Sequence, residues 1–340
     1  MYQTSITPKE AGQRLDKYLH RILPEAGNGF LYKMLRKKNI TLNGKKADGS
    51  EKVAAGDKVS IYFSEETLAR FMGQRQPSQQ EESVYREAFH RLSTVTVLYE
   101  SEHILLADKP AGVLSQKASV TDFSLNEWLI GYLLESGFMT KGELALFKPS
   151  VCNRLDRNTS GIVLCAKSLQ GAQMLGELLK NRTLHKYYQL YVKGCIAEEK
   201  LIEGYLSKDE KYNKVSVSFD IPAGNETDRA KIRTKYRPLR QEYDKTLLEV
   251  ELITGKSHQI RAHLSGMGHP LLGDYKYGDR AWNESYRQKF GVQSQLLHAY
   301  KVVFPRLEEP FSDISGRTFL AEPPAIFYLV SDREAQIRDY

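Results

Sequence analysis

Strand-like segments outnumber helical ones between residues 94 and 340, and several follow one another without a helix between them. Helical patterns there occupy only 124–136, 168–181 and about 257–267. A parallel strand pair needs a crossover of a dozen or more residues, whereas antiparallel strands are joined by short turns. The pattern therefore predicts an α+β domain with a large, mostly antiparallel sheet. Its expected strands, marked by alternating or short apolar runs, are 95–99, 104–107, 161–166, 187–192, 214–219, 231–236 and 247–253.

The first 64 residues have a different pattern and carry most of the positive charge. Residues 12–23 and 30–38 place apolar side chains at helical spacing, and 40–46 alternate like a strand that turns at Asn43-Gly44. The segment holds 12 Lys and Arg against 6 Asp and Glu, a net charge of +6 out of +7 for the whole chain. A basic surplus confined to a small unit indicates polyanion binding, and an ordinary solvated surface is the alternative.

This arrangement resembles the S-four-type RNA-binding domain over about residues 12–63. The resemblance rests on Arg14-Leu15-Asp16, on the basic second helix, and on the Ile-Thr-Leu-Asn-Gly-Lys turn at 40–45. It implies a small α/β module over residues 1–64 that binds RNA. The cations expected to contact phosphates are Arg36, Lys37, Lys38 and Lys45.

Residues 65–93 are expected to connect this module to a second domain at 94–340. The stretch 74–83 is polar, contains no apolar residue other than Pro77, and shows no period. Such a composition is typical of a linker. We expect it to let the small module move relative to the second domain.

Composition narrows the class of protein further. No apolar run approaches the roughly 18 residues that a membrane helix needs, and the N-terminus lacks the layout of a secretory signal. Three cysteines are too few, and odd in number, for a disulfide framework. We expect a cytoplasmic protein with no membrane partner that acts as a monomer.

A reactive carboxylate is predicted at Asp156, which lies between Arg154 and Arg157 in a loop just before an apolar strand. Nearby cations would keep this carboxyl group ionised, as a nucleophile must be. The alternative is a structural ion pair, with residues 158–160 simply making a turn.

Two further segments favour the reactive site. In 185–192, Tyr188 and Leu190 share one strand face, although a strand tyrosine is usually a core residue. In 254–264, Ser257 could cap a helix that carries Arg261 one turn later. Helix starts and arginines both suit phosphate or carboxylate groups.

Together these segments resemble the RluA-type family of pseudouridine synthases over about residues 94–330. The matching motifs are Arg154-Leu155-Asp156 with Thr159-Ser160-Gly161, Lys186-Tyr187-Tyr188, residues 254–261, Gly268-His269-Pro270, Gly273-Asp274, residues 108–112 and 297–299. Two positions depart from the family pattern: Asn153 stands where many relatives carry His, and Lys256 stands where Arg is usual.

The resemblance implies isomerisation of uridine in RNA and a role for each matched residue. Asp156 would attack either ribose carbon 1′ or uracil carbon 6, Tyr188 would stack on the target base, and Arg261 would pair with the aspartate. Arg154 would enter the RNA stack when the uridine is flipped out. Further contacts to RNA are expected from Lys186, His258 and Gln259. Large-subunit ribosomal RNA is the expected substrate, transfer RNA is the alternative, and no cofactor is required because substrate and product are isomers.

Other classes of protein fit these residues less well. His258, His263 and His269 are close in sequence, but their spacing does not put all three on one helix face, so no metal is expected. A glycosidase would need a second carboxylate beside Asp156, and these segments offer none. A non-catalytic RNA-binding protein is disfavoured because Asp156, Tyr188 and Arg261 are all present.

Overall fold

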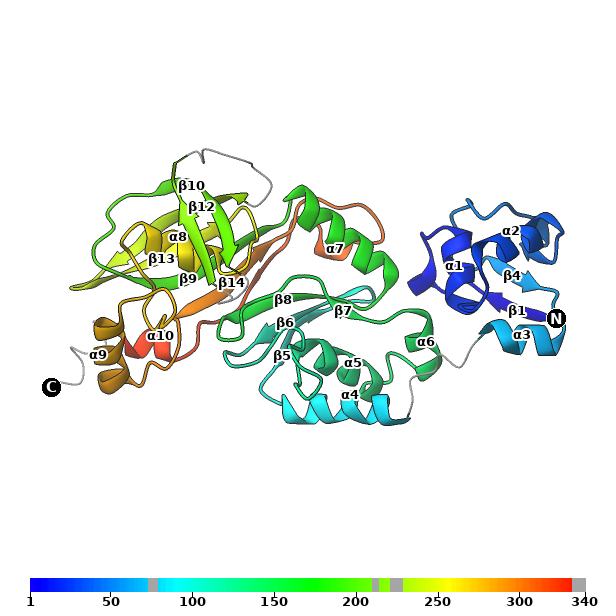
Figure 1. Cartoon of the computed structure of the whole chain (residues 1–340), viewed down its shortest axis with the longest axis horizontal. Helices are drawn as coiled ribbons and strands as arrows, with labels where there is room; N and C mark the ends of the chain where they lie inside the picture. The colour runs from blue at the N-terminus through cyan, green and yellow to red at the C-terminus, as the bar shows by residue number, and fades with distance from the viewer. Residues whose placement is uncertain (73–78, 210–213, 221–228, 332–340) are drawn as a thin grey trace.

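In the computed structural model, which describes residues 1–72, 79–209, 214–220 and 229–331, the chain forms two units, each built on its own sheet (Figure 1). A four-stranded sheet lies in the N-terminal unit, drawn in blue, and an eleven-stranded sheet forms the body of the second unit. No helix within the described ranges is long and apolar enough to cross a membrane.

The N-terminal unit packs two helices on its small sheet. Leu15, Leu19 and Leu35 are fully buried, as the helical spacing predicts. The predicted turn is present: Asn43 and Gly44 have φ values of 51° and 73°, a conformation that these two residues tolerate. The elements are α1 (Leu15–Ile22), α2 (Asn28–Arg36), β1 (Tyr2–Ser5), β2 (Ile40–Leu42), β3 (Lys45–Lys46) and β4 (Lys58–Ile61), with strand order β1-β4-β2-β3.

The segment predicted as a polar linker, residues 65–93, is largely helical in its described part. α3 (Glu65–Met72) packs Leu68 and Phe71 on the core of the N-terminal unit. α4 (Gln79–Arg91) buries Tyr85 and Ala88 against α5 (Leu125–Glu135). The apolar residues of α4 lie beyond its polar first turns, which concealed the helical period. The rest of the predicted polar stretch, residues 74–78, lies outside the described residues.

The large sheet is mostly antiparallel, as the order of elements predicts. Its order is β11-β10-β12-β13-β9-β14-β8-β6-β5, with β15 on β14 and β7 on β8, and among the described strands only β14 and β8 pair in parallel. The strands are β5 (Thr96–Glu100), β6 (Ile104–Lys109), β7 (Ser150–Val151), β8 (Ser160–Ala166), β9 (His185–Lys193), β10 (Lys200–Asp209), β11 (Lys214–Ser218), β12 (Arg229–Gln241), β13 (Lys245–Leu252), β14 (Leu297–Val303) and β15 (Thr318–Leu320).

Helices cover both faces of this sheet because its central strands are apolar on both sides. On β6, Leu105 and Ala107 join the apolar cluster of α5, whereas Ile104 and Leu106 join that of α7. This is the period of two that a strand imposes. The remaining helices are α6 (Lys141–Leu146), α7 (Leu169–Asn181), α8 (Gln259–Gly266), α9 (Arg280–Phe290), α10 (Ile326–Leu329), η1 (Pro8–Glu10) and η3 (Ser312–Ile314).

The start of β8 is fixed by a glycine against which β14 packs closely. Gly161 has a φ of 108°, and a Cβ atom there would lie 2.2 Å from the carbonyl oxygen of Ala299. Only glycine fits such an approach. The close packing anchors the end of the loop that carries Asp156.

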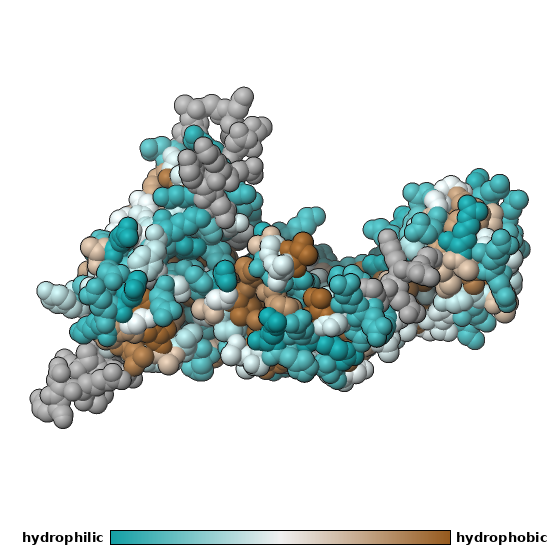
Figure 2. Space-filling model, turned by 60° about the horizontal axis from the view of Figure 1, so that its bottom comes forward, coloured by the Kyte–Doolittle hydropathy of each residue, from teal (hydrophilic) through white to brown (hydrophobic). Residues whose placement is uncertain are grey.

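The two units touch through small surfaces. η1 contacts α7, α1 contacts α6, and Leu146 of α6 packs against the core of the N-terminal unit. Hydrophilic residues cover much of the N-terminal unit in the view of Figure 2.

Candidate active site

The loop that carries Asp156 is held on both sides by residues from 109–115. The Ser115 hydroxyl donates to the carbonyl of Leu155 at 2.9 Å and accepts from its N–H at 3.0 Å. The buried Lys109 ammonium donates to the carbonyl of Arg157 at 3.1 Å. Burial lowers the pKa of Lys109 to about 7, against the attraction of Asp156 and Asp108. These hydrogen bonds therefore fix the backbone on both sides of Asp156.

Asn153, one of the two departures from the family pattern, contributes to the same support. Its side-chain oxygen accepts from the N–H of Leu164 in β8 at 2.7 Å. The amide therefore ties the beginning of the loop to the strand that follows it.

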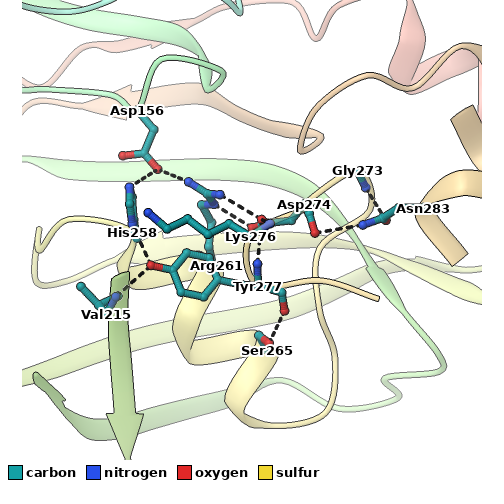
Figure 3. Close-up of polar contacts among 10 residues, drawn as sticks. All are labelled: Asp156, Val215, His258, Arg261, Ser265, Gly273, Asp274, Lys276, Tyr277 and Asn283. Atoms are coloured by element: carbon teal, nitrogen blue, oxygen red, sulfur yellow. Dashed lines mark hydrogen bonds and ion pairs between the residues drawn. The ribbon is translucent and has the colours of Figure 1, made fainter. Parts of the chain in front are cut away.

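Arg261 on α8 links two carboxylates (Figure 3). Its Nη1 donates to Oδ2 of Asp156 at 3.0 Å, while Nε and Nη2 donate to Asp274 at 2.7 and 2.9 Å. The predicted pairing of Arg261 with Asp156 is thus present in the structure. Asp274, to which the sequence assigned no role, holds the guanidinium in place.

Asp274 is itself a fully buried carboxylate with four donors. Besides Arg261, the backbone N–H groups of Lys276 and Tyr277 donate to its Oδ1 at 2.9 and 3.1 Å. Burial opposes its ionisation, but these hydrogen bonds and the guanidinium charge hold the pKa of Asp274 below its usual value. The buried ion pair therefore has the additional hydrogen bonds that such pairs need.

Tyr188 and Lys186 reach the site from β9. Tyr188 is 5% exposed and lines the same pocket as Asp156 and Arg261. Burial, reinforced by Asp156, raises its pKa well above the usual value, so the hydroxyl keeps its proton. Lys186, two residues earlier on the same strand face, lines the adjoining cleft, and burial lowers its pKa.

His258 stands at the start of α8 in a left-handed conformation, with a φ of 54°. The helix begins after His258, so Ser257 is not its cap as predicted. The His258 Nδ1 atom lies 2.8 Å from the Tyr277 hydroxyl, and Nε2 lies 3.9 Å from Oδ2 of Asp156. The ring is therefore beside the carboxylate.

Gln259 has no hydrogen-bonding capacity left for RNA. Its amide nitrogen donates to the carbonyl of Arg233 and to the Thr234 hydroxyl, both at 3.0 Å. Its oxygen accepts from the Thr254 hydroxyl at 2.9 Å and from the Lys256 N–H at 3.1 Å. Two donor hydrogens and two lone pairs are all that an amide side chain has. The geometry favours a structural role for Gln259 over the RNA contact expected from sequence.

A cleft of about 670 Å³ opens beside Asp156 and is strongly basic. Among the described residues that line it, Asp156 is the only acidic one. Arg154 is exposed there, and its side chain makes no hydrogen bond or ion pair with any residue in the described ranges. The cations lining the cleft are Lys117, Arg154, Arg157, Arg182, Lys186 and Lys256.

The cations predicted in the N-terminal unit lie apart from this cleft. Arg36 ends α2, Lys37 and Lys38 follow it, and Lys45 begins β3. All four side chains are exposed. These four exposed cations are here called the α2–β3 patch.

No group of three or more His, Cys, Asp or Glu side chains within the described ranges is arranged to hold a metal ion.

Comparisons with known proteins identify the class to which this fold and site belong. The profile of the family described as RNA pseudouridylate synthase matches residues 103–266. A solved structure titled "Human RNA Pseudouridylate Synthase Domain Containing 4" superposes with a TM-score of 0.56 at 21% identity, covering 74% of this chain and 95% of that one, which shows the shared fold.

Curated relatives match most of the chain. "Ribosomal large subunit pseudouridine synthase C" of Vibrio cholerae is 30% identical over 295 residues, 86% of this chain and 85% of that protein. The protein of the same name from Escherichia coli K12 is 30% identical over 309 residues, 88% of this chain and 87% of that protein. The chain therefore belongs to the RluA-type pseudouridine synthases and is an isomerase that acts on RNA.

Proposed function

We propose that this enzyme converts uridine to pseudouridine in large-subunit ribosomal RNA, with Asp156 as the reacting carboxylate. One observation carries the proposal: of the lining residues that the structure describes, Asp156 is the single acid in a basic cleft, and Arg261 engages its Oδ2. The names of the curated relatives support the choice of RNA. Because the proposed substrate is ribosomal RNA, we place its action in the cytoplasm. We propose separately that it acts as a monomer.

The proposed chemistry exchanges one glycosidic bond for another. The bond from ribose carbon 1′ to uracil N1 breaks, a bond from carbon 1′ to carbon 5 forms, carbon 5 loses a proton and N1 gains one. Asp156 attacks carbon 1′ or carbon 6 through Oδ1, because Arg261 occupies Oδ2, and the covalent bond from Asp156 to that carbon breaks again before the product is released. Tyr188 stacks on the base. Its hydroxyl, which keeps its proton, lies in the same pocket as Asp156. Atoms balance without a redox partner.

Two RNAs incubated with the purified protein test the choice of substrate. Unmodified transcripts of large-subunit ribosomal RNA and of transfer RNA are compared by nucleoside analysis under the same conditions. We expect pseudouridine to form at defined positions in the ribosomal transcript. Formation in transfer RNA alone would overturn the choice of substrate while leaving the chemistry in place.

Arg154 is proposed to fill the space that the flipped uridine leaves. Extracting a stacked base costs a few kcal/mol, and a guanidinium that stacks and contacts phosphate offsets part of that cost. We expect Arg154→Ala to lose about tenfold more activity on a stem-loop than on an unstructured strand with the same target uridine. Single-turnover rates on the two RNAs measure the difference.

A matched variant gives the control for this prediction. Arg182→Ala also removes a cleft cation, and we expect it to slow both RNAs to the same extent because a phosphate contact does not depend on base stacking. Equal losses on both RNAs with Arg154→Ala would refute the flipping role.

We further propose that the N-terminal unit is an S-four-type module that binds RNA phosphates through the α2–β3 patch. Changing all four patch residues to Gln should reduce the salt dependence of RNA binding, lowering the slope of log K against log salt by about 3. Affinity measured between low and moderate salt gives this slope. Catalysis at saturating RNA should be retained, because the patch lies in a different unit from Asp156.

The control neutralises an equal number of exposed cations in the second unit. An unchanged slope in the patch variant, or an equal change in both variants, would remove the role proposed for the patch. The control residues are Lys200, Arg280, Lys289 and Arg306.

A further inference from the structure

We propose that His258 is a positioning residue for Asp156, and that Tyr277 fixes the tautomer of His258 so that the ring presents an N–H to the carboxylate. The inference rests on the proposed role of Asp156. It assigns a task to a histidine and a tyrosine that the uridine chemistry above does not use.

The imidazole lies between the tyrosine and the carboxylate (Figure 3). Nδ1 is 2.8 Å from the Tyr277 hydroxyl, and Nε2, on the other side of the ring, is 3.9 Å from Oδ2 of Asp156. The rings of His258 and Tyr277 meet edge to face, with centroids 5.6 Å apart. One nitrogen is thus engaged by the protein, and the other faces the reacting group.

The hydroxyl of Tyr277 determines which nitrogen carries the proton. The N–H of Val215 on β11 donates to this hydroxyl oxygen at 3.0 Å. The hydroxyl has one proton of its own, and in the described part of the chain its acceptor is Nδ1 of His258. Nδ1 is therefore an acceptor, and the proton of the neutral ring sits on Nε2, toward Asp156.

The charges around the ring favour this neutral form. Burial lowers the pKa of His258 and outweighs the attraction of Asp156, and the positive charges of Arg261 and Lys276 act in the same direction as burial. The Arg261 guanidinium also lies over the Tyr277 ring, 5.1 Å from its centroid. A positive charge on the His258 ring would be repelled by the charges of Arg261 and Lys276.

The backbone of His258 is held in a conformation that few residues adopt. Its φ of 54° is sparsely populated for a residue with a Cβ atom, and such outliers persist only where the surroundings enforce them. Gln259, tied to Thr254 and to the N–H of Lys256, fixes the adjoining loop. The ring makes no cap hydrogen bond to α8, and its two nitrogens face Tyr277 and Asp156 instead.

Two donors on the same oxygen would fix the rotation of the carboxylate. Within the described ranges, Arg261 is the one donor that hydrogen-bonds Oδ2, because the 3.9 Å separation of His258 is too long for a hydrogen bond. Catalytic hydrogen bonds often tighten only when substrate is bound. With RNA in the cleft, we expect Nε2–H to close on Oδ2 and leave Oδ1 for the ribose or base.

Single-turnover rates at saturating ribosomal RNA, measured with the full chain, test the proposal. His258→Leu should react about thirtyfold more slowly, with RNA affinity nearly unchanged, because a misdirected carboxylate affects the reaction rather than binding. His258→Gln, which can place an amide N–H near Nε2, should recover most of the rate. Tyr277→Phe should slow the reaction about tenfold. Tyr286→Phe is the matched control, since it also loses a side-chain hydrogen bond of a tyrosine hydroxyl, in this case to Asp244 at 2.6 Å, away from the cleft.

Nitrogen-15 NMR of the histidine ring in the wild-type protein tests the tautomer without any variant. The proposal predicts a protonated Nε2 and an unprotonated Nδ1 on His258, and a mixture of tautomers in Tyr277→Phe. A proton on Nδ1 in the wild type, or a wild-type rate for His258→Leu, would overturn it. Asp156→Asn is measured in the same assay. An active Asp156→Asn variant would refute the proposed function itself. An inactive Asp156→Asn together with an active His258→Leu would refute only the role of His258.

Discussion

Replacing Asp156 with asparagine is expected to abolish pseudouridine formation, with a rate at least about a hundredfold below wild type. The amide keeps the shape of the side chain and an oxygen for Arg261, but it has no charge with which to attack carbon. The loop should stay in place, because Ser115 and Lys109 hold its backbone rather than its side chain. Single-turnover assays with RNA in excess of its dissociation constant measure the loss.

RNA binding separates a chemical defect from a folding defect in this variant. Affinity for RNA should be close to that of the wild type, since the cations of the cleft remain. Asp279→Asn, which loses a surface pair with Lys193, is the control and should keep its activity. Turnover by Asp156→Asn above a few per cent of wild type would contradict the role of Asp156 as nucleophile.

Arg261→Ala is expected to be nearly inactive and also less stable. It leaves Asp274 fully buried without its counter-charge, a change that costs about 3–5 kcal/mol in buried pairs. It also removes the donor that holds Oδ2 of Asp156. Thermal unfolding and single-turnover rates measure the two losses separately.

Arg261→Lys distinguishes the loss of activity from the loss of stability. The lysine retains a positive charge for Asp274 but lacks the fork that reaches both carboxylates. We expect it to be more stable than Arg261→Ala and still at least about tenfold slower than wild type. A stable Arg261→Lys with wild-type turnover would show that the link between Asp274 and Asp156 is not needed.

The local patterns in the sequence predict many elements of the fold, but they miss others, among them β10, β14 and α9. The period of two places Lys186, Tyr188 and Leu190 on one face of β9, and Ser168 caps α7 by accepting from the N–H of Gly171, at the start of the helix expected there. The helix α4 was missed because its buried residues follow a polar first half. Secondary structure that depends on neighbours along the chain is readable from sequence.

The long-range contacts of the site could not be predicted in the same way. Ser115 lies 40 residues before Leu155 and Lys109 lies 48 before Arg157, and nothing in the local sequence says that a hydroxyl and an ammonium will bond these carbonyls. The sequence motif that contains Asp274 indicates no role for this residue, whereas the structure shows that it accepts a hydrogen bond from Arg261. Such partners are brought together by the topology of the sheet.

The expected RNA contact of Gln259 illustrates the same limit. The residue lies at the start of the predicted helix, beside residues that face the cleft, and only its four hydrogen bonds with the protein show that it supports the loop. The neighbouring residue His258 has a left-handed backbone conformation, and its ring lies beside Asp156.

A pseudouridine map of large-subunit ribosomal RNA tests the whole account most directly. The RNA is taken from a strain that lacks this gene and from the same strain supplied with the wild-type chain or with Asp156→Asn. We predict that defined uridines lose the modification in the deletion strain, regain it with the wild-type chain, and remain unmodified with Asp156→Asn. An unchanged map in the deletion strain, or restoration by Asp156→Asn, would contradict the account.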